Sequence, residues 1–307
     1  MDHRRPDSTE RSLETYHYEL KLFVHWCEEQ QIEKVSDLNG WLLDQFETSR
    51  RGDDIAPTTL LGNMKTLRQF LKYLASIDAV DPELPEKVNV PNVSASEQIN
   101  DEMLEPERAL EIIRYFRNSE DQYGLRLHAF FELIWYTGAR MGGLRALDLQ
   151  DWYPDEGYIE FRHRPDTGTP LKNKKDGERP VSLPDETVDV IETYLDSREW
   201  WNVHDEHGRR PLLTTRQGRP STSSIRAWSY GVTLPCTIGI CPHDRDPENC
   251  SWTIPRAASK CPSSRSPHPI RSGSITWQLN RGLPPEVVSA RVNADPTIIK
   301  KHYDQAT

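Results

Sequence analysis

No apolar run in the 307-residue chain approaches the roughly 18 residues that a membrane-spanning helix requires. The first residues, Met1 to Asp7, lack the hydrophobic stretch of a secretory signal. Internal repeats and low-complexity tracts are also lacking, which excludes solenoid and disordered-tail architectures. We therefore expect a soluble, cytoplasmic protein that is long enough for two ordinary domains.

Net positive charge is missing as well. The formal net charge is -10, with 48 Asp and Glu against 38 Lys and Arg. This balance argues against a nucleic-acid partner, because phosphate binding normally rests on clustered Lys and Arg. The basic residues are unevenly distributed, however: Arg256 to Lys301 contains eight Lys or Arg and only two acids. A local basic surface can therefore coexist with an acidic whole, and the lysine-poor, acidic remainder resembles proteins adapted to high salt.

Cysteine is scarce, and four of the five cysteines fall in one segment, at Cys236, Cys241, Cys250 and Cys261. The segment, an expected insert at about residues 232–262, is rich in Pro, Asp and Ser and has little periodic structure. One interpretation is a tetrahedral, structural Zn²⁺ site with His243 as a spare ligand; the other is a cluster of free thiols, whereas disulfides fit less well. The fifth cysteine, Cys27, lies on an apolar seam and is expected to pack in a core.

Apolar residues repeat at helical spacing in the first part of the chain. Leu13, Tyr16, Leu20, Phe23 and Cys27 form one stripe; a second helix is predicted from Ser36 through Phe46, and a third from Pro57 through Leu74. We predict a small helical bundle over residues 1–80. Three prolines between residues 80 and 96 predict an extended linker over residues 81–100.

The remaining part, residues 101–307, mixes helices and strands. Helices are predicted at 107–116, 125–136 and 184–195, and short strands at 158–161 and 179–183, joined by a basic loop. The fold class is therefore mainly α with a small β-sheet (α+β).

Residues suited to phosphodiester chemistry are scattered over this second part. Arg140 follows the second predicted helix in Thr137-Gly-Ala-Arg140, and His268-Pro-Ile-Arg271 has the i, i+3 spacing of one helical face. A lysine-rich loop lies between the strands, and Tyr303 stands near the end. Each part alone has an ordinary structural explanation, such as a helix cap or a solvated turn. Together they are the parts needed to break a phosphodiester bond covalently.

The order of these motifs resembles the tyrosine recombinases, also called phage-type integrases. The resemblance implies an N-terminal helical, SAM-like core-binding domain, a C-terminal catalytic domain, and site-specific cleavage and rejoining of double-stranded DNA through a 3′-phosphotyrosyl link. It also implies a homo-oligomer, a tetramer on DNA at the nucleoid, and chemistry without a nucleotide or other cofactor. The site residues that it implies are Arg140, Lys175 or Lys174, His268, Arg271 and Tyr303.

Two positions depart from the family pattern. Ala294 stands nine residues before Tyr303, where the family usually has His or Trp, and Gly143 stands where an acidic residue is common. The sequence has four residues after Tyr303, whereas members of the family generally have a longer tail that packs on a neighbouring subunit. Two alternatives therefore stay open: a DNA-binding protein of recombinase ancestry that no longer cuts, and a relaxing enzyme of the type IB topoisomerase kind.

Overall fold

The computed structural model describes residues 10–94, 102–197, 203–297 and 299. The chain divides into two compact units, Met1–Asp101 (unit 1) and Glu102–Thr307 (unit 2). Within the described ranges, none of the helices combines the length and the apolar character needed to cross a bilayer.

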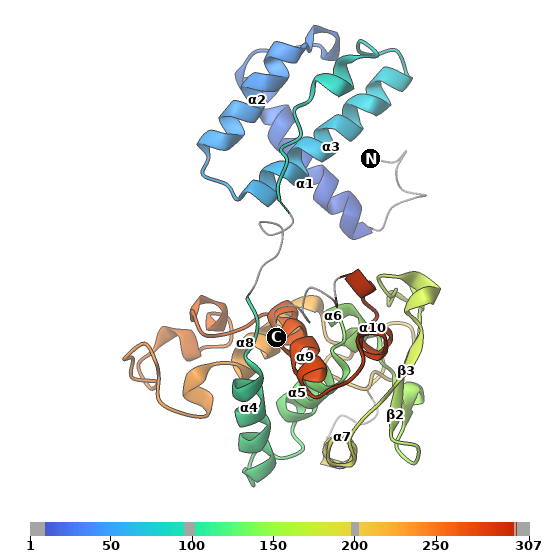
Figure 1. Cartoon of the computed structure of the whole chain (residues 1–307), viewed down its shortest axis with the longest axis vertical. Helices are drawn as coiled ribbons and strands as arrows, with labels where there is room; N and C mark the ends of the chain where they lie inside the picture. Colours follow the sequence, from blue (N-terminus) through green and yellow to red (C-terminus); the bar gives the residue numbers. More distant parts are fainter. Residues whose placement is uncertain (1–9, 95–101, 198–202, 298, 300–307) are drawn as a thin grey trace. The chain divides into compact units, whose positions relative to one another are not determined.

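Unit 1 is a bundle of three helices, α1 (Glu10–Glu29), α2 (Gly40–Gly52) and α3 (Pro57–Ser76) (Figure 1). Apolar side chains from all three meet in one core, in which Phe23 and Phe46 are almost fully buried. The predicted start of α2 at Ser36 is wrong. Asn39 caps that helix by accepting a hydrogen bond from the Leu42 backbone N–H at 3.1 Å, and a separate 3-10 turn, η2 (Val35–Asp37), precedes it.

The predicted extended linker is partly folded onto unit 1. A 3-10 turn, η3 (Leu84–Lys87), and the residue after it bury Leu84 and Val88 to 1% exposure in the core of unit 1. The Arg68 guanidinium donates to the Val88 carbonyl at 2.6 Å. The linker prediction is therefore wrong for this stretch, because its prolines shape a packed turn instead of an open strand.

Unit 2 combines helices with a small antiparallel sheet, which confirms the predicted fold class. The sheet has the order β1-β2-β3, with β2 and β3 near the predicted positions and β1 not predicted (Figure 1). The strands are β1 (Trp152–Tyr153), β2 (Tyr158–Phe161) and β3 (Arg179–Ser182). The helices are α4 (Pro106–Asn118), α5 (Arg126–Thr137), α6 (Met141–Ala146), α7 (Asp185–Ser197), α8 (Thr222–Val232), α9 (Pro267–Asn280) and α10 (Pro285–Val292). Short 3-10 turns are η4 (Leu149–Asp151), η5 (Pro165–Thr167), η6 (Lys174–Gly177), η7 (Pro235–Thr237), η8 (Ser251–Thr253) and η9 (Ala258–Lys260).

Helix α5 forms the centre of unit 2, as its apolar sequence predicts. Its residues from Ala129 to Trp135 are fully buried, including Glu132, whose carboxylate accepts hydrogen bonds from Arg117 at 2.8 Å and from Thr187 at 2.8 Å. A buried carboxylate is tolerated because these partners replace water.

Helix α9 packs directly on α5 and on the chain that precedes α4. A Cβ added at Gly273 would stand 1.9 Å from the Leu104 carbonyl oxygen, so only glycine permits this approach. The Leu104 backbone N–H donates to the Pro269 carbonyl at 3.0 Å, which fixes the first turn of α9. This packing positions the His268 and Arg271 side chains.

Candidate active site

Arg140 is positioned by a sharp turn at the end of α5. Gly138 adopts a left-handed conformation (φ 57°) and ends the helix, and two residues later Arg140 occupies the N-cap of α6. The Arg140 Nη1 donates to the Asn293 carbonyl at 2.6 Å. The first predicted arginine is thereby tied to the residue that ends α10, 153 residues further along the chain.

Arg271 reaches the same place from α9. Its side chain is buried, with 4% exposure, and its Nη1 donates to the carbonyls of Gly138 at 2.5 Å and Val292 at 2.7 Å. His268 lies one helical turn earlier on α9, as its i, i+3 spacing predicted. The structure therefore brings Arg140, His268 and Arg271 together from remote parts of the sequence.

Both arginines use only part of their donor capacity. In the described part of the chain, Arg140 and Arg271 form their hydrogen bonds through Nη1 alone. Each guanidinium therefore keeps its Nε and Nη2 donors without a protein partner among those residues. These two donors form the parallel fork that matches two oxygens of a phosphate or carboxylate.

Arg179 adds a third guanidinium, which the sequence motifs did not assign to the site. It lies on β3, donates from Nε to the Arg291 carbonyl at 2.6 Å, and stands 4.3 Å above the Phe161 ring. A Cβ added at Gly143 would lie 3.3 Å from that ring, so this position has little room for the acidic side chain expected from the family pattern.

The electrostatics of this arginine cluster, which we define as Arg140, Arg179 and Arg271, are unusual. No carboxylate within the described ranges forms an ion pair with any of the three. Burial, followed by the charges of Arg140 and Arg179, lowers the pKa of Arg271 to about 9. Burial, followed by the charges of Arg140 and Arg291, lowers the pKa of Arg179 to about 10. Like charges held together without a counter-ion favour the binding of an anion.

Two other arginines of unit 2, Arg209 and Arg219, have the opposite environment. Arg219 pairs with Asp148 and with Asp205 at 2.8 Å, and Arg209 contacts the same two carboxylates at 3.1 and 3.5 Å. These pairs account for their burial, so they belong to the framework and not to the site.

His268 is exposed at the rim of the arginine cluster. Its pKa is lowered by partial burial and then by the charges of Arg271, Arg140 and Lys172. At neutral pH the imidazole is therefore mostly neutral and can accept a proton.

A third lysine of this loop, besides the two predicted, acts on the site. Lys174 and Lys175 lie in the exposed turn η6, and it is the charge of Lys172 that acts on His268. Lys172 is thus a further candidate for the site lysine, beside Lys174 and Lys175.

Asn293 is a second missed residue. It ends α10 in a left-handed conformation (φ 52°), accepts from the Asn173 side chain at 2.6 Å and donates to the Asp176 carbonyl at 2.9 Å. Its own carbonyl holds Arg140, so Asn293 connects the lysine loop to the arginine cluster. Ala294, which stands where the family usually has His or Trp, therefore directly follows a residue with an amide side chain. An Asn just after a helix is a signal for this conformation that the sequence did offer.

Tyr303 lies outside the described residues. The described residue nearest to it in sequence, Ile299, is fully buried and packs with Ile275 and Leu279 of α9 and with Val288 and Val292 of α10. Ile299 is therefore packed on α9, which carries Arg271, and on α10, whose Val292 carbonyl accepts a hydrogen bond from Arg271.

The four clustered cysteines are not yet arranged around a metal. Among the residues that the structure describes, no group of three or more His, Cys, Asp or Glu side chains is placed to hold a metal ion. Cys27 packs against the core of unit 1, as predicted, and burial raises the pKa of its thiol to about 11.

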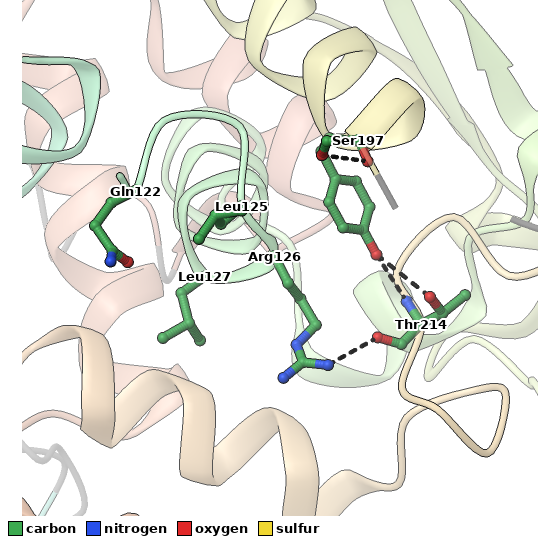
Figure 2. Close-up of a pocket in the computed structure, with 7 residues that line it drawn as sticks. Gln122, Leu125, Arg126, Leu127, Ser197 and Thr214 are labelled. Carbon is green, nitrogen blue, oxygen red and sulfur yellow. Dashed lines mark hydrogen bonds between the residues drawn. The ribbon is translucent and has the colours of Figure 1, made fainter. Parts of the chain in front are cut away.

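A well-formed cavity elsewhere in unit 2 does not coincide with the site. It has a volume of about 310 Å³ and is lined by Gln122, Leu125, Arg126, Leu127, Tyr194, Ser197 and Thr214. Figure 2 shows that the Arg126 guanidinium points to the Thr214 carbonyl, and it also lies 5.0 Å from the Trp228 ring. None of its lining residues belongs to the arginine cluster, and none is a carboxylate, so the cavity does not share the chemistry of the site.

Comparisons with known proteins bear on the fold of the chain. No family model matches the chain. Tyrosine recombinase XerC of Treponema denticola is 25% identical over 147 residues, which cover 47% of this chain and 46% of that protein, so the match spans about half of the relative's length. The Tn1549 transposon integrase in complex with a circular intermediate DNA matches 98% of this chain and 91% of that chain with a TM-score of 0.71 and 12% identity. The N-terminal domain of a phage integrase/site-specific recombinase from Haloarcula marismortui is 51% identical over 29% of this chain and 86% of that chain, with a TM-score of 0.29.

Proposed function

Because the chain has the fold of the tyrosine recombinases and integrases, as the sequence resemblance predicted, we propose that it is a site-specific DNA recombinase. It would cleave and rejoin DNA strands through a 3′-phosphotyrosyl link at Tyr303. The observation that carries the proposal is the arginine cluster: no carboxylate among the described residues pairs with it, and Arg140 and Arg271 keep open Nε and Nη2 donors there.

A phosphodiester in double-stranded DNA suits these donors. It presents two non-bridging oxygens with one negative charge, and charge builds up on them as a nucleophile attacks phosphorus. Two guanidinium forks can hold these oxygens at once, and fixed donors of this kind are each worth about 10²–10³ in rate. The carbonyl bonds to Gly138 and Val292 hold Arg271 in position before the substrate arrives.

Tyr303 is the proposed nucleophile. It follows Ile299 by four positions in the sequence, and that length of chain spans at most about 14 Å. A tyrosine hydroxyl has an ordinary pKa near 10, so it needs a proton acceptor at neutral pH. The neutral imidazole of His268 meets this need. The Tyr303 oxygen then bonds to phosphorus while the bond from phosphorus to the 5′ oxygen breaks.

The departing 5′ oxygen needs a proton. We assign this role to Lys172, whose charge acts on His268, and keep Lys174 and Lys175 as the alternatives. Rejoining reverses the step, because the 5′ hydroxyl of a second strand attacks the phosphotyrosyl bond and releases Tyr303. The proposed steps use side chains of this chain alone and draw on no metal or nucleotide.

The partners follow from this chemistry. We propose that unit 1 (the helical domain) binds the duplex and unit 2 (the catalytic domain) cleaves it. Exchange between two duplexes uses four cleavage events, so the protein would act as a tetramer on DNA, at the nucleoid of the cytoplasm.

The test is covalent trapping. Full-length protein is incubated with a library of labelled, nicked duplexes of random sequence, and adducts are recovered after denaturation and sequenced. Wild type should form adducts at one preferred sequence, and Tyr303→Phe should form none. Arg140→Ala and Arg271→Ala should reduce adducts by at least ~10². Arg114→Ala, an exposed arginine on α4, should leave them unchanged.

Two outcomes would overturn the proposal. Sequence-specific binding by wild type without any adduct would indicate a DNA-binding protein that no longer cuts. Relaxation of supercoiled plasmid without sequence preference would indicate an enzyme of the topoisomerase kind.

A further inference from the structure

Residues 233–266, between α8 and α9, form a segment that the proposed reaction does not use. We call it the cysteine segment. Its only regular elements in the structure are the 3-10 turns η7, η8 and η9. In Figure 1 it lies on one side of unit 2 and the sheet on the other.

The cysteine segment has almost no core of its own. Its apolar cluster consists of Leu234, Ala258 and Cys261, with Cys236 and Trp252 partly buried against them. The large side chain of Ile240 is 96% exposed. Segments of this size that lack a core normally need a covalent or metal cross-link to hold one conformation.

The cysteines occupy the points that organise the segment. Cys236 and Cys261 pack in the same apolar cluster, although 25 positions separate them in sequence. Tight turns of the segment also start at cysteines. The Cys241 carbonyl accepts a hydrogen bond from the Asp244 N–H at 3.3 Å, and the Cys250 carbonyl accepts one from the Thr253 N–H at 3.1 Å. The Cys261 carbonyl accepts from Ser264 in the same way, at 3.1 Å. Three of the four cysteines thus open a tight turn.

Side-chain contacts also bring the chain on either side of the other cysteines together. The His243 Nε2 lies 2.9 Å from the Ser263 hydroxyl, and the His243 ring packs edge-on against Trp252. These three residues stand two positions from Cys241, Cys261 and Cys250, so the neighbourhoods of all four cysteines meet in one place.

We propose that Cys236, Cys241, Cys250 and Cys261 bind one Zn²⁺ ion, which holds the cysteine segment together. Four thiolates form the tetrahedral, closed ligand set of structural zinc, and soft sulfur ligands select zinc over magnesium or calcium. Since the described residues contain no group already placed around a metal, the sulfurs must converge when zinc binds. Short turns permit this movement more readily than helices or strands would.

His243 is not needed as a ligand. Its Nε2 lies 2.9 Å from the Ser263 hydroxyl, and its ring packs edge-on against Trp252. These contacts give the imidazole a place in the segment without a metal.

Zinc would also brace the entry to α9. The Ser264 hydroxyl donates to the carbonyls of Cys261 and Ala258, and the Arg265 N–H donates to the Thr233 hydroxyl at 2.7 Å. The helix that carries His268 begins at Pro267, three residues after Ser264. Loss of the metal should therefore loosen the start of α9 without removing any group from the arginine cluster.

The first measurement is metal content. Full-length protein, purified without added chelator, is analysed by inductively coupled plasma mass spectrometry. One zinc per chain is expected for wild type and for Cys27→Ser, the control outside the segment. Cys241→Ser and Cys250→Ser should each lose the metal. Retention of full zinc by both variants, or equal loss in His243→Ala, would overturn the four-cysteine ligand set.

The second measurement needs no variant and so does not depend on how well a variant folds. A thiol reagent is added to native wild type before and after a strong chelator. The four segment cysteines should be protected until the chelator removes zinc, whereas Cys27 reacts, or stays buried, equally in both samples. Protein that contains no zinc, takes up none when reduced, and exposes all four thiols without chelator would refute the proposal. Neither readout involves DNA, so failure here leaves the proposed recombinase function untouched, and the reverse also holds.

Discussion

Arg271 is a buried residue of unit 2 with 4% exposure, and the side chain of Arg219 is 5% exposed, but their surroundings differ. Arg219 pairs with two carboxylates, whereas among the described residues Arg271 donates hydrogen bonds only to backbone carbonyls. We predict that Arg271→Met leaves the free energy of unfolding of unit 2 unchanged or raises it, while Arg219→Met lowers it by about 3 kcal/mol. The more damaging substitution for stability is thus the one outside the site.

The magnitudes follow from the two environments. A pKa of about 9 for Arg271, against the higher ordinary value of arginine, corresponds to a cost of about 4–5 kcal/mol for keeping the guanidinium group charged in the folded protein at neutral pH. Methionine removes this cost but leaves two carbonyls short of a donor, which costs about 1–3 kcal/mol. Breaking a buried pair usually costs about 3–5 kcal/mol. The lower end applies to Arg219, since Arg209 still contacts both carboxylates at 3.1 and 3.5 Å.

Urea unfolding followed by tryptophan fluorescence measures both variants against wild type, and covalent trapping measures their activity. Arg271→Met should lose adduct formation while keeping its midpoint, and Arg219→Met should show the lower midpoint. Inorganic phosphate should stabilise wild type more than Arg271→Met, because an anion relieves the repulsion in the arginine cluster. A loss of stability in Arg271→Met as large as that in Arg219→Met would refute a cluster held without a counter-ion.

Three further predictions concern the surroundings of the site. Proton NMR should find His268 titrating below its ordinary pKa. The contribution of this group to the free energy of unfolding is then complete above about pH 6.5 and is lost as the pH drops through the pKa of the folded state. Lys172→Ala should raise the pKa of His268, and an equal rise in Lys175→Ala would contradict the assignment of the lysine. Gly273→Ala should prevent unit 2 from folding while unit 1 keeps its helices by circular dichroism, because the new Cβ would stand 1.9 Å from a backbone carbonyl oxygen; a soluble variant with unchanged unfolding would disprove that close approach. Asn293→Gly keeps the left-handed backbone but removes the amide, so adduct formation should fall by about 10-fold or more with little change in stability, and unaltered trapping would show that the amide does not position the loop.

The helices with a clear apolar stripe were predictable from sequence, and α1, α3, α5 and α7 lie where periodicity placed them. The elements that escaped prediction are short or end-capped by local contacts. The start of α2 depends on the Asn39 cap, and the two-residue strand β1 exists only because β2 pairs with it. Periodicity over 11–18 residues cannot detect such elements.

Arg140, His268 and Arg271 could be named from sequence because each sits in a short motif whose local spacing carries information. Lys172 and Asn293 could not, since their roles depend on where a loop and a helix end meet in space. The number of residues between a lysine and a strand does not give the path of the turn between them.

The amino-acid sequence by itself determined the mainly α character of the chain, its two-part organisation and the residue types available for phosphate chemistry, because these depend on local periodicity and on short motifs. Only the tertiary structure decided that three arginines stand together with no carboxylate partner in the described part of the chain and that Asn293 joins them to the lysine loop. The reason is physical: the state of a charge depends on what surrounds it in three dimensions, and its neighbours here come from positions more than 100 residues apart.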